Sequence, residues 1–258
     1  MDGLREFLKV VADTAAIETL PRFRTPHEIG NKVAGGFDPV TEADRAAERA
    51  IRRVIEERYP DHSILGEEFG ASGAGSDYEW VIDPIDGTRA FISGLPLWGT
   101  LVGLKRGGRA IAGVMAQPFT GETFIADGNG SWYDGPGGRR KLATSAVTKL
   151  ADAIMCTTTP ALFTDKHRVS YDRIEKAVRL ARYGTDCYAY CMLAAGHVDL
   201  VVEIGLQPYD IVALVPIIEQ AGGVITTADG GRPEQAGHIV AAANPALHAA
   251  ALELLNRS

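Results

Sequence analysis

The stretch Trp80-Val-Ile-Asp-Pro-Ile-Asp-Gly-Thr88 decides both the fold and the chemistry that this chain can support. Its first three residues have the apolar pattern of a buried strand, which runs directly into two aspartates three positions apart. Pro84 fixes one backbone angle and biases Asp83 towards an extended conformation, so we expect a stiff turn at the strand end. Gly87 lets the backbone approach a ligand closely, and Thr88 would begin a short helix whose unpaired N–H groups suit a phosphate. An Asp-Gly pair alone indicates only a turn, but the second acid and the helix start together favour a metal and anion site.

Other acidic residues could join Asp83 and Asp86. Glu67 and Glu68 end the preceding short strand, although a Glu-Glu pair alone is usually a solvated surface feature. Asp210 begins a largely apolar helix, where the helix dipole favours an acid without any further role. Carboxylates from these segments would offer oxygen ligands alone, which suit Mg²⁺ or Mn²⁺ rather than Zn²⁺. The six histidines are scattered and lack the paired spacing of a zinc hydrolase.

Hydrophobic periodicity predicts an alternation of helices and strands along the whole chain. Helices are expected at 2–20, 41–59, 165–181, 186–195, 208–221 and 245–255, and strands at 63–65, 80–82, 97–104, 110–116, 122–126, 198–204, 224–226 and 239–243. The strands between 97 and 126 predict an antiparallel meander, and surface loops are expected at 30–38 and 70–77. The fold class is α/β, with mixed sheets layered between helices.

The character of the chain changes near residue 145, which predicts two closely packed parts. Residues 1–145 would form an α+β part with the metal and phosphate motif. Residues 146–258 would form an α/β part with the last metal ligand and a segment that selects the substrate.

The composition is that of an ordinary globular protein. Of 258 residues, 46% are hydrophobic and 23% are charged, which excludes disorder for the chain as a whole. Lys and Arg number 26 against 33 Asp and Glu, and the net charge of −7 argues against nucleic-acid binding through phosphate contacts. The sequence shows neither a secretory signal nor an apolar stretch of about 18 residues, and its three cysteines lack disulfide or zinc spacing. We therefore expect a cytoplasmic protein that binds neither membranes nor nucleic acids.

Three motifs together resemble the inositol monophosphatase superfamily. They are Gly66-Glu-Glu68, the stretch from Trp80 to Thr88, and Tyr209-Asp210 followed by Ala221-Gly-Gly223. The resemblance extends from Asp38 to the C-terminal helix and departs at Tyr209, where many members have tryptophan. It implies a layered αβαβα sandwich shared with fructose-1,6-bisphosphatase, and a magnesium-dependent, lithium-sensitive phosphomonoesterase. Because members are often dimers, it also implies a homodimer.

The resemblance further implies a role for each matching residue. Two or three Mg²⁺ ions, or Mn²⁺, would be held by Glu67, Asp83, the backbone carbonyl of Ile85, Asp86 and Asp210, with Asp83 bridging two of them. Thr88 with Asp44 would orient and deprotonate the attacking water, with Glu67 also assigned to catalysis. The N–H groups of Gly87 and Thr88 would bind the phosphate. Asp44 has an alternative structural interpretation as the acid of a capping box with Thr41.

The second half resembles the histidinol-phosphate phosphatase branch of the superfamily. The resemblance lies in Arg182-Tyr-Gly-Thr-Asp-Cys-Tyr-Ala-Tyr190 and Gly205-Leu-Gln-Pro-Tyr-Asp210. Asp186 stands where inositol phosphatases usually have a small residue, and a carboxylate there could pair with the cationic end of histidinol phosphate. Glu203 is a second candidate for the same end. Asp186 could instead cap a helix as part of Thr185-Asp186.

The sequence thus predicts Mg²⁺-dependent hydrolysis of L-histidinol phosphate, a small phosphorylated metabolite, in histidine biosynthesis. A sister activity on inositol 1-phosphate or 3′-phosphonucleotides is the nearest alternative, because the metal motif does not select the substrate. An alternative of another class is a module that binds metal and a phosphorylated metabolite without turnover. Thr88 and Asp44 argue against that module, since binding alone needs no pair of residues to activate water.

Overall fold

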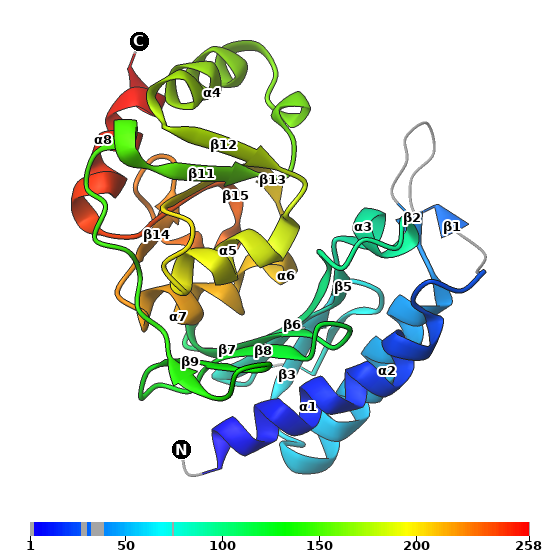
Figure 1. Cartoon of the computed structure of the whole chain (residues 1–258). Coiled ribbons are helices and arrows are strands. Elements are labelled where there is room, and N and C mark those ends of the chain that lie inside the picture. The colour runs from blue at the N-terminus through cyan, green and yellow to red at the C-terminus, as the bar shows by residue number, and fades with distance from the viewer. Residues whose placement is uncertain (1–2, 27–29, 32–38, 74, 258) are drawn as a thin grey trace.

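The computed structural model describes residues 3–26, 30–31, 39–73 and 75–257. Five layers follow one another in the order helices, sheet, helices, sheet, helices (Figure 1). This arrangement is the α/β layered sandwich that the sequence predicts, and that prediction is confirmed. The loop expected at 30–38 lies outside the described residues, apart from Gly30 and Asn31.

The larger sheet carries the motif of residues 80–88. It has eight strands in the order β10 (Arg140–Lys141), β9 (Ser131–Asp134), β8 (Glu122–Ala126), β7 (Arg109–Gln117), β6 (Gly99–Arg106), β5 (Tyr78–Asp86), β3 (Ser63–Gly66) and β4 (Gly70–Ser72). All neighbouring pairs are antiparallel except β3 and β5, which run parallel. The meander expected between 97 and 126 is therefore confirmed.

The smaller sheet lies in the second half of the chain. Its five strands have the order β12 (Leu180–Tyr183), β11 (Ile154–Thr157), β13 (Leu200–Leu206), β15 (Gly237–Ala242) and β14 (Val224–Thr227). Strands β12, β11 and β13 are parallel, and the other two pairings are antiparallel. A separate short ribbon pairs β1 (Gly30–Asn31) with β2 (Pro39–Val40).

Helices fill the three remaining layers. The outer layer on the larger sheet consists of α1 (Leu4–Thr19) and α2 (Glu42–Arg58), and the middle layer of α5 (Asp186–Ala194), α6 (Pro208–Ile211) and α7 (Leu214–Glu219). The outer layer on the smaller sheet consists of α4 (Asp165–Ala177) and α8 (Pro245–Asn256). Short turns of helix complete the chain, namely α3 (Thr88–Ile92) and the 3₁₀ segments η1 (Leu20–Arg22), η2 (Leu150–Asp152), η3 (Pro160–Leu162) and η4 (Pro233–Gln235). Across the described ranges, no helix combines the length and apolar character that crossing a bilayer requires.

Several expected elements in the second half are wrong. The helix expected at 165–181 ends at Ala177, and 180–183 form the edge strand β12. The side chains of β12 are mostly exposed, so this strand lacks the alternation that reveals a half-buried one. The helix expected at 208–221 is broken into α6 and α7, because Pro216 in the first turn of α7 has no N–H to continue the hydrogen bonds of α6. Periodicity also missed the short strand β11 in the second half and β9 and β10 in the first half. The loop expected at 70–77 is wrong at its start, where Gly70–Ser72 form strand β4 beside β3.

Strand β5 shows how the layers position the acidic motif. Side chains on a strand alternate between its two faces. Trp80 and Ile82 pack into the apolar cluster beneath α1 and α2, whereas Val81 packs into the cluster that contains the middle helices. Asp83 is two residues beyond Val81 and therefore faces the middle layer. The short helix α6, which contains Asp210, lies in that layer and packs against β5.

Two glycines allow the middle helices to approach the larger sheet. Gly103 on β6 and Gly113 on β7 are opposite each other in register. A Cβ atom on Gly113 would lie 2.3 Å from the carbonyl oxygen of Ala213, and one on Gly103 would lie 2.7 Å from the amide nitrogen of Ala213. Ala213 joins α6 to α7, so this glycine pair sets the depth at which Asp210 enters the site.

We expect Gly113→Ala to lower the free energy of unfolding by about 1–3 kcal/mol, because the new methyl group overpacks the contact with Ala213. Urea unfolding of the purified variant measures this loss. Gly231→Ala is the control, since a Cβ there would meet only the side chains of Thr227 and Asp229 in an exposed turn. An unfolding midpoint of Gly113→Ala equal to that of the control would contradict the close approach.

Candidate active site

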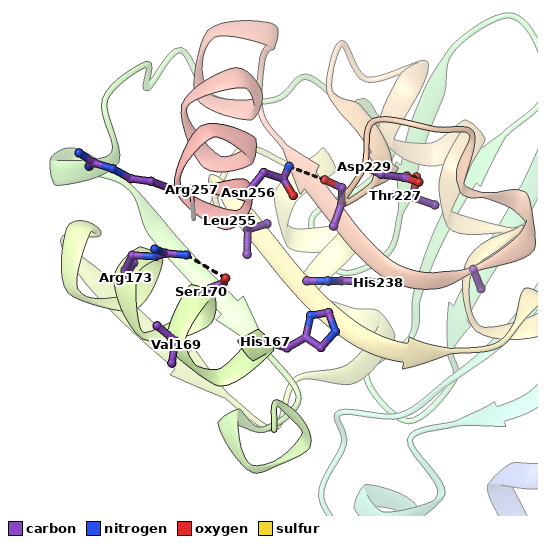
Figure 2. A pocket seen from close by; sticks show the side chains of 12 residues that line it. His167, Val169, Ser170, Arg173, Thr227, Asp229, His238, Leu255, Asn256 and Arg257 are labelled. Atoms are coloured by element: carbon purple, nitrogen blue, oxygen red, sulfur yellow. Dashed lines mark hydrogen bonds between the residues drawn. The ribbon is translucent and has the colours of Figure 1, made fainter. Parts of the chain in front are cut away.

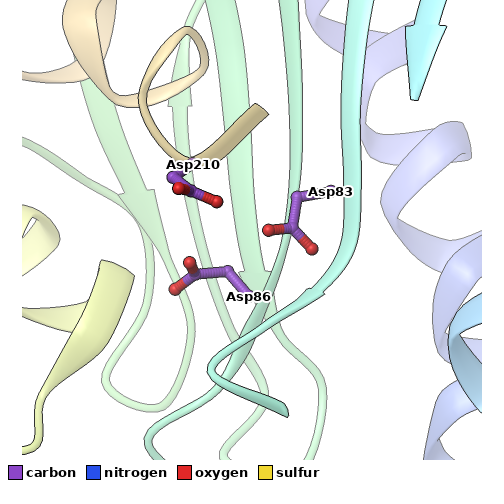
Figure 3. Close-up of side chains that lie close together, drawn as sticks. All are labelled: Asp83, Asp86 and Asp210. Carbon is purple, nitrogen blue, oxygen red and sulfur yellow. The ribbon is translucent and has the colours of Figure 1, made fainter. Parts of the chain in front are cut away.

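Three aspartates from two distant parts of the chain, strand β5 and helix α6, meet between the larger sheet and the middle helices. The carboxyl groups of Asp83, Asp86 and Asp210 are directed towards one another (Figure 3). One carboxylate oxygen from each lies within 4.8 Å of the other two. We call these three residues the acidic triad. All three belong to the ligand set that the sequence predicts.

Glu67 joins the triad through the parallel pairing of β3 and β5. Because parallel strands end at the same edge of a sheet, the residue after β3 lies beside the end of β5. The amide of Glu67 donates to the carbonyl oxygen of Ile82 at 3.1 Å, which fixes this position. Burial raises the pKa of Asp83 well above its usual range, and the charge of Glu67 and a hydrogen bond between the two carboxyl groups raise it further.

An irregular turn separates Asp83 from Asp86. The register with β6 shifts between these residues, so Pro84 and Ile85 bulge out of the ladder. The amide of Ile85 donates to Asp83 Oδ1 at 3.0 Å, and the hydroxyl of Thr100 donates to the carbonyl of Pro84 at 2.8 Å. The stiff turn expected at Pro84 is therefore present and held by hydrogen bonds at both of these points.

Backbone amides also orient the other two triad members. Asp86 Oδ2 accepts from the amide of Cys187 at 2.8 Å, and Asp210 Oδ2 accepts from the amide of Gln207 at 2.7 Å. The second bond is half of a capping box at the start of α6. Asp210 therefore lies in the first turn of a helix and also has a carboxylate oxygen beside those of Asp83 and Asp86, so the two roles considered from the sequence are compatible.

The electrostatics of the triad fit a divalent cation. Burial raises the pKa of Asp86, as it does that of Asp83, and the charges of Asp210 and Asp186 act in the same direction. Like charges at this spacing in a buried place disfavour one another strongly unless a cation or proton lies between them. Hard oxygen donors that converge from three segments, as Glu67, Asp83 with Asp86, and Asp210 do, are the kind of ligand set that Mg²⁺ or Mn²⁺ prefers. The residues therefore fit the metal that the sequence predicts.

Thr88 and Asp44, the residues predicted to activate water, have separate hydrogen-bond partners. The hydroxyl of Thr88 donates to the carbonyl of Ile85 at 3.1 Å. Asp44 Oδ2 accepts from the amide of Thr41 at 2.8 Å and from its hydroxyl at 2.6 Å, which is the expected capping box of α2. Within the described ranges, Asp44 Oδ1 is buried and has no hydrogen-bond partner. Burial raises the pKa of Asp44, and the nearby charge of Glu67 adds to that effect.

Gly87 forms the junction between the triad and an adjoining pocket. Its φ of +81° is in the left-handed region, which a glycine adopts without strain. A Cβ atom here would lie 3.2 Å from Asp186 Oδ2 and 3.2 Å from the carbonyl oxygen of Leu97. The side chain of any larger residue would therefore fill the space between Asp86 and Asp186.

The adjoining pocket has a volume of about 320 Å³. Its wall includes Asp86 and Asp210 of the triad, the predicted phosphate-binding residues Gly87 and Thr88, and the predicted specificity residues Asp186 and Glu203. Arg89 and Tyr190 also line it. The structure thus gathers in one place most of the residues predicted for metal, phosphate and substrate, from both halves of the chain.

Asp186 and Glu203 share one partner, Thr158. The hydroxyl of Thr158 lies 3.1 Å from Asp186 Oδ1 and 3.0 Å from Glu203 Oε1, and its amide donates to Glu203 Oε1 at 2.6 Å. The interpretation of Asp186 as a helix cap is wrong. The cap position belongs to Thr185, and Asp186 is the first helical residue, with φ at +40° and a carboxylate turned towards Thr158 and Gly87.

Three residues of this region were missed by sequence reasoning. Thr158 and Tyr190 line the pocket, and the buried hydroxyl of Tyr190 has no hydrogen-bond partner in the described part of the chain. Glu48 of α2 is fully buried and accepts from the amide of Glu68 at 2.7 Å and from Arg52 at 2.7 Å. Glu48 therefore holds the turn that carries Glu67. Its only sequence signal was an acid on the apolar face of a helix, four residues before an arginine.

Known proteins resemble this chain in sequence and in structure. Residues 2–258 match the model of the inositol monophosphatase family. The chloroplastic bifunctional phosphatase IMPL2 of Arabidopsis thaliana is 40% identical, over 95% of this chain and 72% of that protein. A histidinol-phosphatase of Streptomyces coelicolor is 35% identical, over 100% of this chain and 98% of that protein. Among solved structures, an inositol monophosphatase from Zymomonas mobilis superimposes with a TM-score of 0.86 and 37% identity, over 97% of this chain and 96% of that one.

The buried position of Glu203 predicts a pH dependence of stability. Burial raises the pKa of Glu203 to about 8, from about 4.5 for an ordinary glutamate. Since the folded state holds this proton more tightly than the unfolded state, the stability that the proton confers is complete below pH 4.5 and is lost as pH rises through 8.

We therefore expect Glu203→Gln, which keeps the neutral form, to flatten the decline of unfolding free energy between pH 5 and 8. Urea unfolding in metal-free buffer at several pH values measures the slope. The control is Glu253→Gln on α8, which replaces an exposed acid. Its unfolding free energy should change with pH at the same slope as in the parent protein. A slope in Glu203→Gln as steep as in the parent would show that Glu203 is ionised throughout this range.

Proposed function

This chain belongs to the inositol monophosphatase family and is a phosphatase of that family, and on that premise we propose that it hydrolyses L-histidinol phosphate to L-histidinol and phosphate. The reaction would need Mg²⁺ and would be a step of histidine biosynthesis. The proposal includes a homodimer in the cytoplasm, as the family resemblance implies.

The observation that carries the proposal is the pair of carboxylates beyond the triad. Asp186 and Glu203 are held together by Thr158 in the pocket that Asp86 and Asp210 also line. A phosphate bound beside the triad would direct its alcohol portion towards this pair. Histidinol phosphate carries an ammonium group and an imidazole on that portion. A cation there would favour the ionised forms of Asp186 and of Glu203, whose pKa burial raises to about 8, whereas a neutral polyol would not.

The relatives support this choice of substrate. Proteins named histidinol-phosphatase from Streptomyces coelicolor and Mycobacterium tuberculosis are 35% and 34% identical to this chain. An inositol monophosphatase activity is the competing candidate, since the solved Zymomonas mobilis structure carries that name at 37% identity. The carboxylate of Asp186 next to Gly87 favours histidinol phosphate over inositol phosphate, because a cationic group pairs with a carboxylate more strongly than a neutral hydroxyl does, even where the charge of Arg89 already acts on that carboxylate.

The residues named from sequence would hold the metal ions. Glu67, Asp83, the carbonyl of Ile85, Asp86 and Asp210 would be the ligands of two or three Mg²⁺ ions, or Mn²⁺. When bound, the ions supply a water of lowered pKa and neutralise charge on the phosphate. The Ile85 carbonyl can serve although Thr88 donates to it, since a carbonyl oxygen has two lone pairs.

The remaining steps fall to groups of the chain itself. The amides of Gly87 and Thr88 would hold the phosphate at the start of α3, next to the triad. The hydroxyl of Thr88 would orient the attacking water. Asp44 would accept its proton, because Asp44 Oδ1 has no hydrogen-bond partner in the described ranges and the carboxyl lies near Glu67. A non-catalytic module would have no use for this residue pair.

The function is tested by kcat/KM values for histidinol phosphate, inositol 1-phosphate, adenosine 3′,5′-bisphosphate and p-nitrophenyl phosphate in the presence of Mg²⁺. We expect a clear preference for histidinol phosphate. In Asp186→Ala the kcat/KM for histidinol phosphate should fall about 10- to 100-fold, because one charge-assisted hydrogen bond is lost. The kcat/KM for p-nitrophenyl phosphate should change no more than about threefold.

Asp165→Ala is a matched control for that variant. Asp165 is also the first residue of a helix with positive φ, but it is exposed and lies outside the pocket. A preference of the parent enzyme for any other ester would reject the substrate assignment. Equal losses on both esters in Asp186→Ala would assign Asp186 a structural role, and absence of phosphate release with Mg²⁺ would support the binding module.

A further inference from the structure

A second pocket lies on the opposite face of the smaller sheet from the acidic triad (Figure 2). It is bounded by α4, by β14 and β15, and by the end of α8, and its volume is about 770 Å³. The two pockets share no lining residue. Cavities of this size accommodate drug-sized molecules and are few in any protein. Neither the metal ligands nor the groups proposed for catalysis explain it.

One end of this pocket is built from rings. His167 of α4 faces His238 of β15, with ring centroids 5.4 Å apart and planes at 83°. The ring of Phe163, behind the pocket wall, also packs against His238, with ring centroids 5.9 Å apart. Burial lowers the pKa of His238 to about 4, with a further contribution from His167, so His238 is a neutral ring at pH 7. With Leu255 beside them, these rings form a wall suited to a flat aromatic group.

The other end of the pocket is cationic. Leu255 lies between the two histidines on one side and Arg173 and Arg257 on the other (Figure 2). Neither arginine forms an ion pair with any residue that the structure describes. The one acid on the wall, Asp229, accepts hydrogen bonds from Thr227 and Gly231 of its own turn. A local excess of positive charge in a chain of net charge −7 indicates an anionic occupant.

Two nitrogen atoms of the pocket lack partners. Arg173 donates through Nη2 to the hydroxyl of Ser170 at 3.0 Å, but its buried Nε makes no hydrogen bond to the described residues. His238 Nε2 is likewise buried and without a partner in the described ranges. The large majority of buried side-chain polar atoms are hydrogen-bonded, so these two donors or acceptors on one wall could serve a bound water or ligand.

We propose that this pocket is a second ligand site, for a small aromatic anion. The ring of the ligand would lie against His167, His238 and Leu255, and its acidic group would contact the guanidinium groups of Arg173 and Arg257. Planar guanidinium groups bind carboxylates, sulfonates and phosphates through paired hydrogen bonds. The site is independent of the phosphatase assignment, because it shares no residue with the pocket beside the triad.

The probe for this proposal is 1-anilinonaphthalene-8-sulfonate, which has the required ring and charge and cannot be hydrolysed as a phosphate ester. Its neutral counterpart N-phenyl-1-naphthylamine has the same ring system without the sulfonate. Binding is measured by fluorescence titration and located by NMR of the histidine Cε1–H signals. We expect saturable binding of the anion that shifts the His167 and His238 signals, with at least tenfold weaker binding of the neutral compound.

Arg173→Gln should weaken binding of the anion at least tenfold. Arg168→Gln is the matched control, since it removes the same charge from the same helix at a position outside the pocket, where Arg168 pairs with Asp172 at 2.7 Å. Thermal melting of both variants establishes that they fold. The proposal is overturned if the two histidine signals do not shift, if the neutral compound binds as tightly, or if the two variants bind the anion equally well.

Discussion

The mutual repulsion of closely spaced carboxylates is the constraint around which this protein is organised. Asp83 and Asp86 end strand β5, and the charge of Asp210 raises the cost of ionising both of them, as the charge of Glu67 does for Asp83. The fold holds them there with backbone amides, because an amide of Ile85, Cys187 or Gln207 donates to each triad member. These bonds fix directions without supplying a full positive charge. A divalent cation would supply the positive charge that offsets this repulsion.

Much of the layered fold follows from the need to bring those segments together. Parallel pairing of β3 and β5 places Glu67 beside Asp83, and the facing glycines Gly103 and Gly113 let the helix with Asp210 approach the sheet. The smaller sheet then separates two pockets of opposite character. The pocket on its inner side is lined by four acids, namely Asp86, Asp186, Glu203 and Asp210, whereas the pocket on its outer side is lined by Arg173, Arg257, His167 and His238. If both proposals hold, one sheet would keep two kinds of ligand chemistry apart.

The sequence patterns that predicted the structure best were those in which each residue constrains the backbone for a known physical reason. Asp83 and Asp86 could be predicted because Pro84 and Gly87 fix the turn around them, and the strands from 97 to 126 because turn signals separate them. Strand β12 could not be predicted, since an exposed edge strand lacks alternation. The orientation of Asp186 depends on Thr158, and the turn that carries Glu67 depends on Glu48, which are contacts between distant segments. Periodicity contains no information on such contacts.

The central claim is that the four carboxylates share divalent cations, and it is tested most directly by anomalous diffraction from crystals grown with Mn²⁺. The account predicts manganese peaks enclosed by Asp83, Asp86 and Asp210, with Glu67 as a further ligand and Asp83 in contact with two ions. Crystals of Asp83→Asn grown under the same conditions should lose those peaks while the surrounding fold is retained. Full occupancy of Mn²⁺ elsewhere, with no peak among these side chains, would contradict the account.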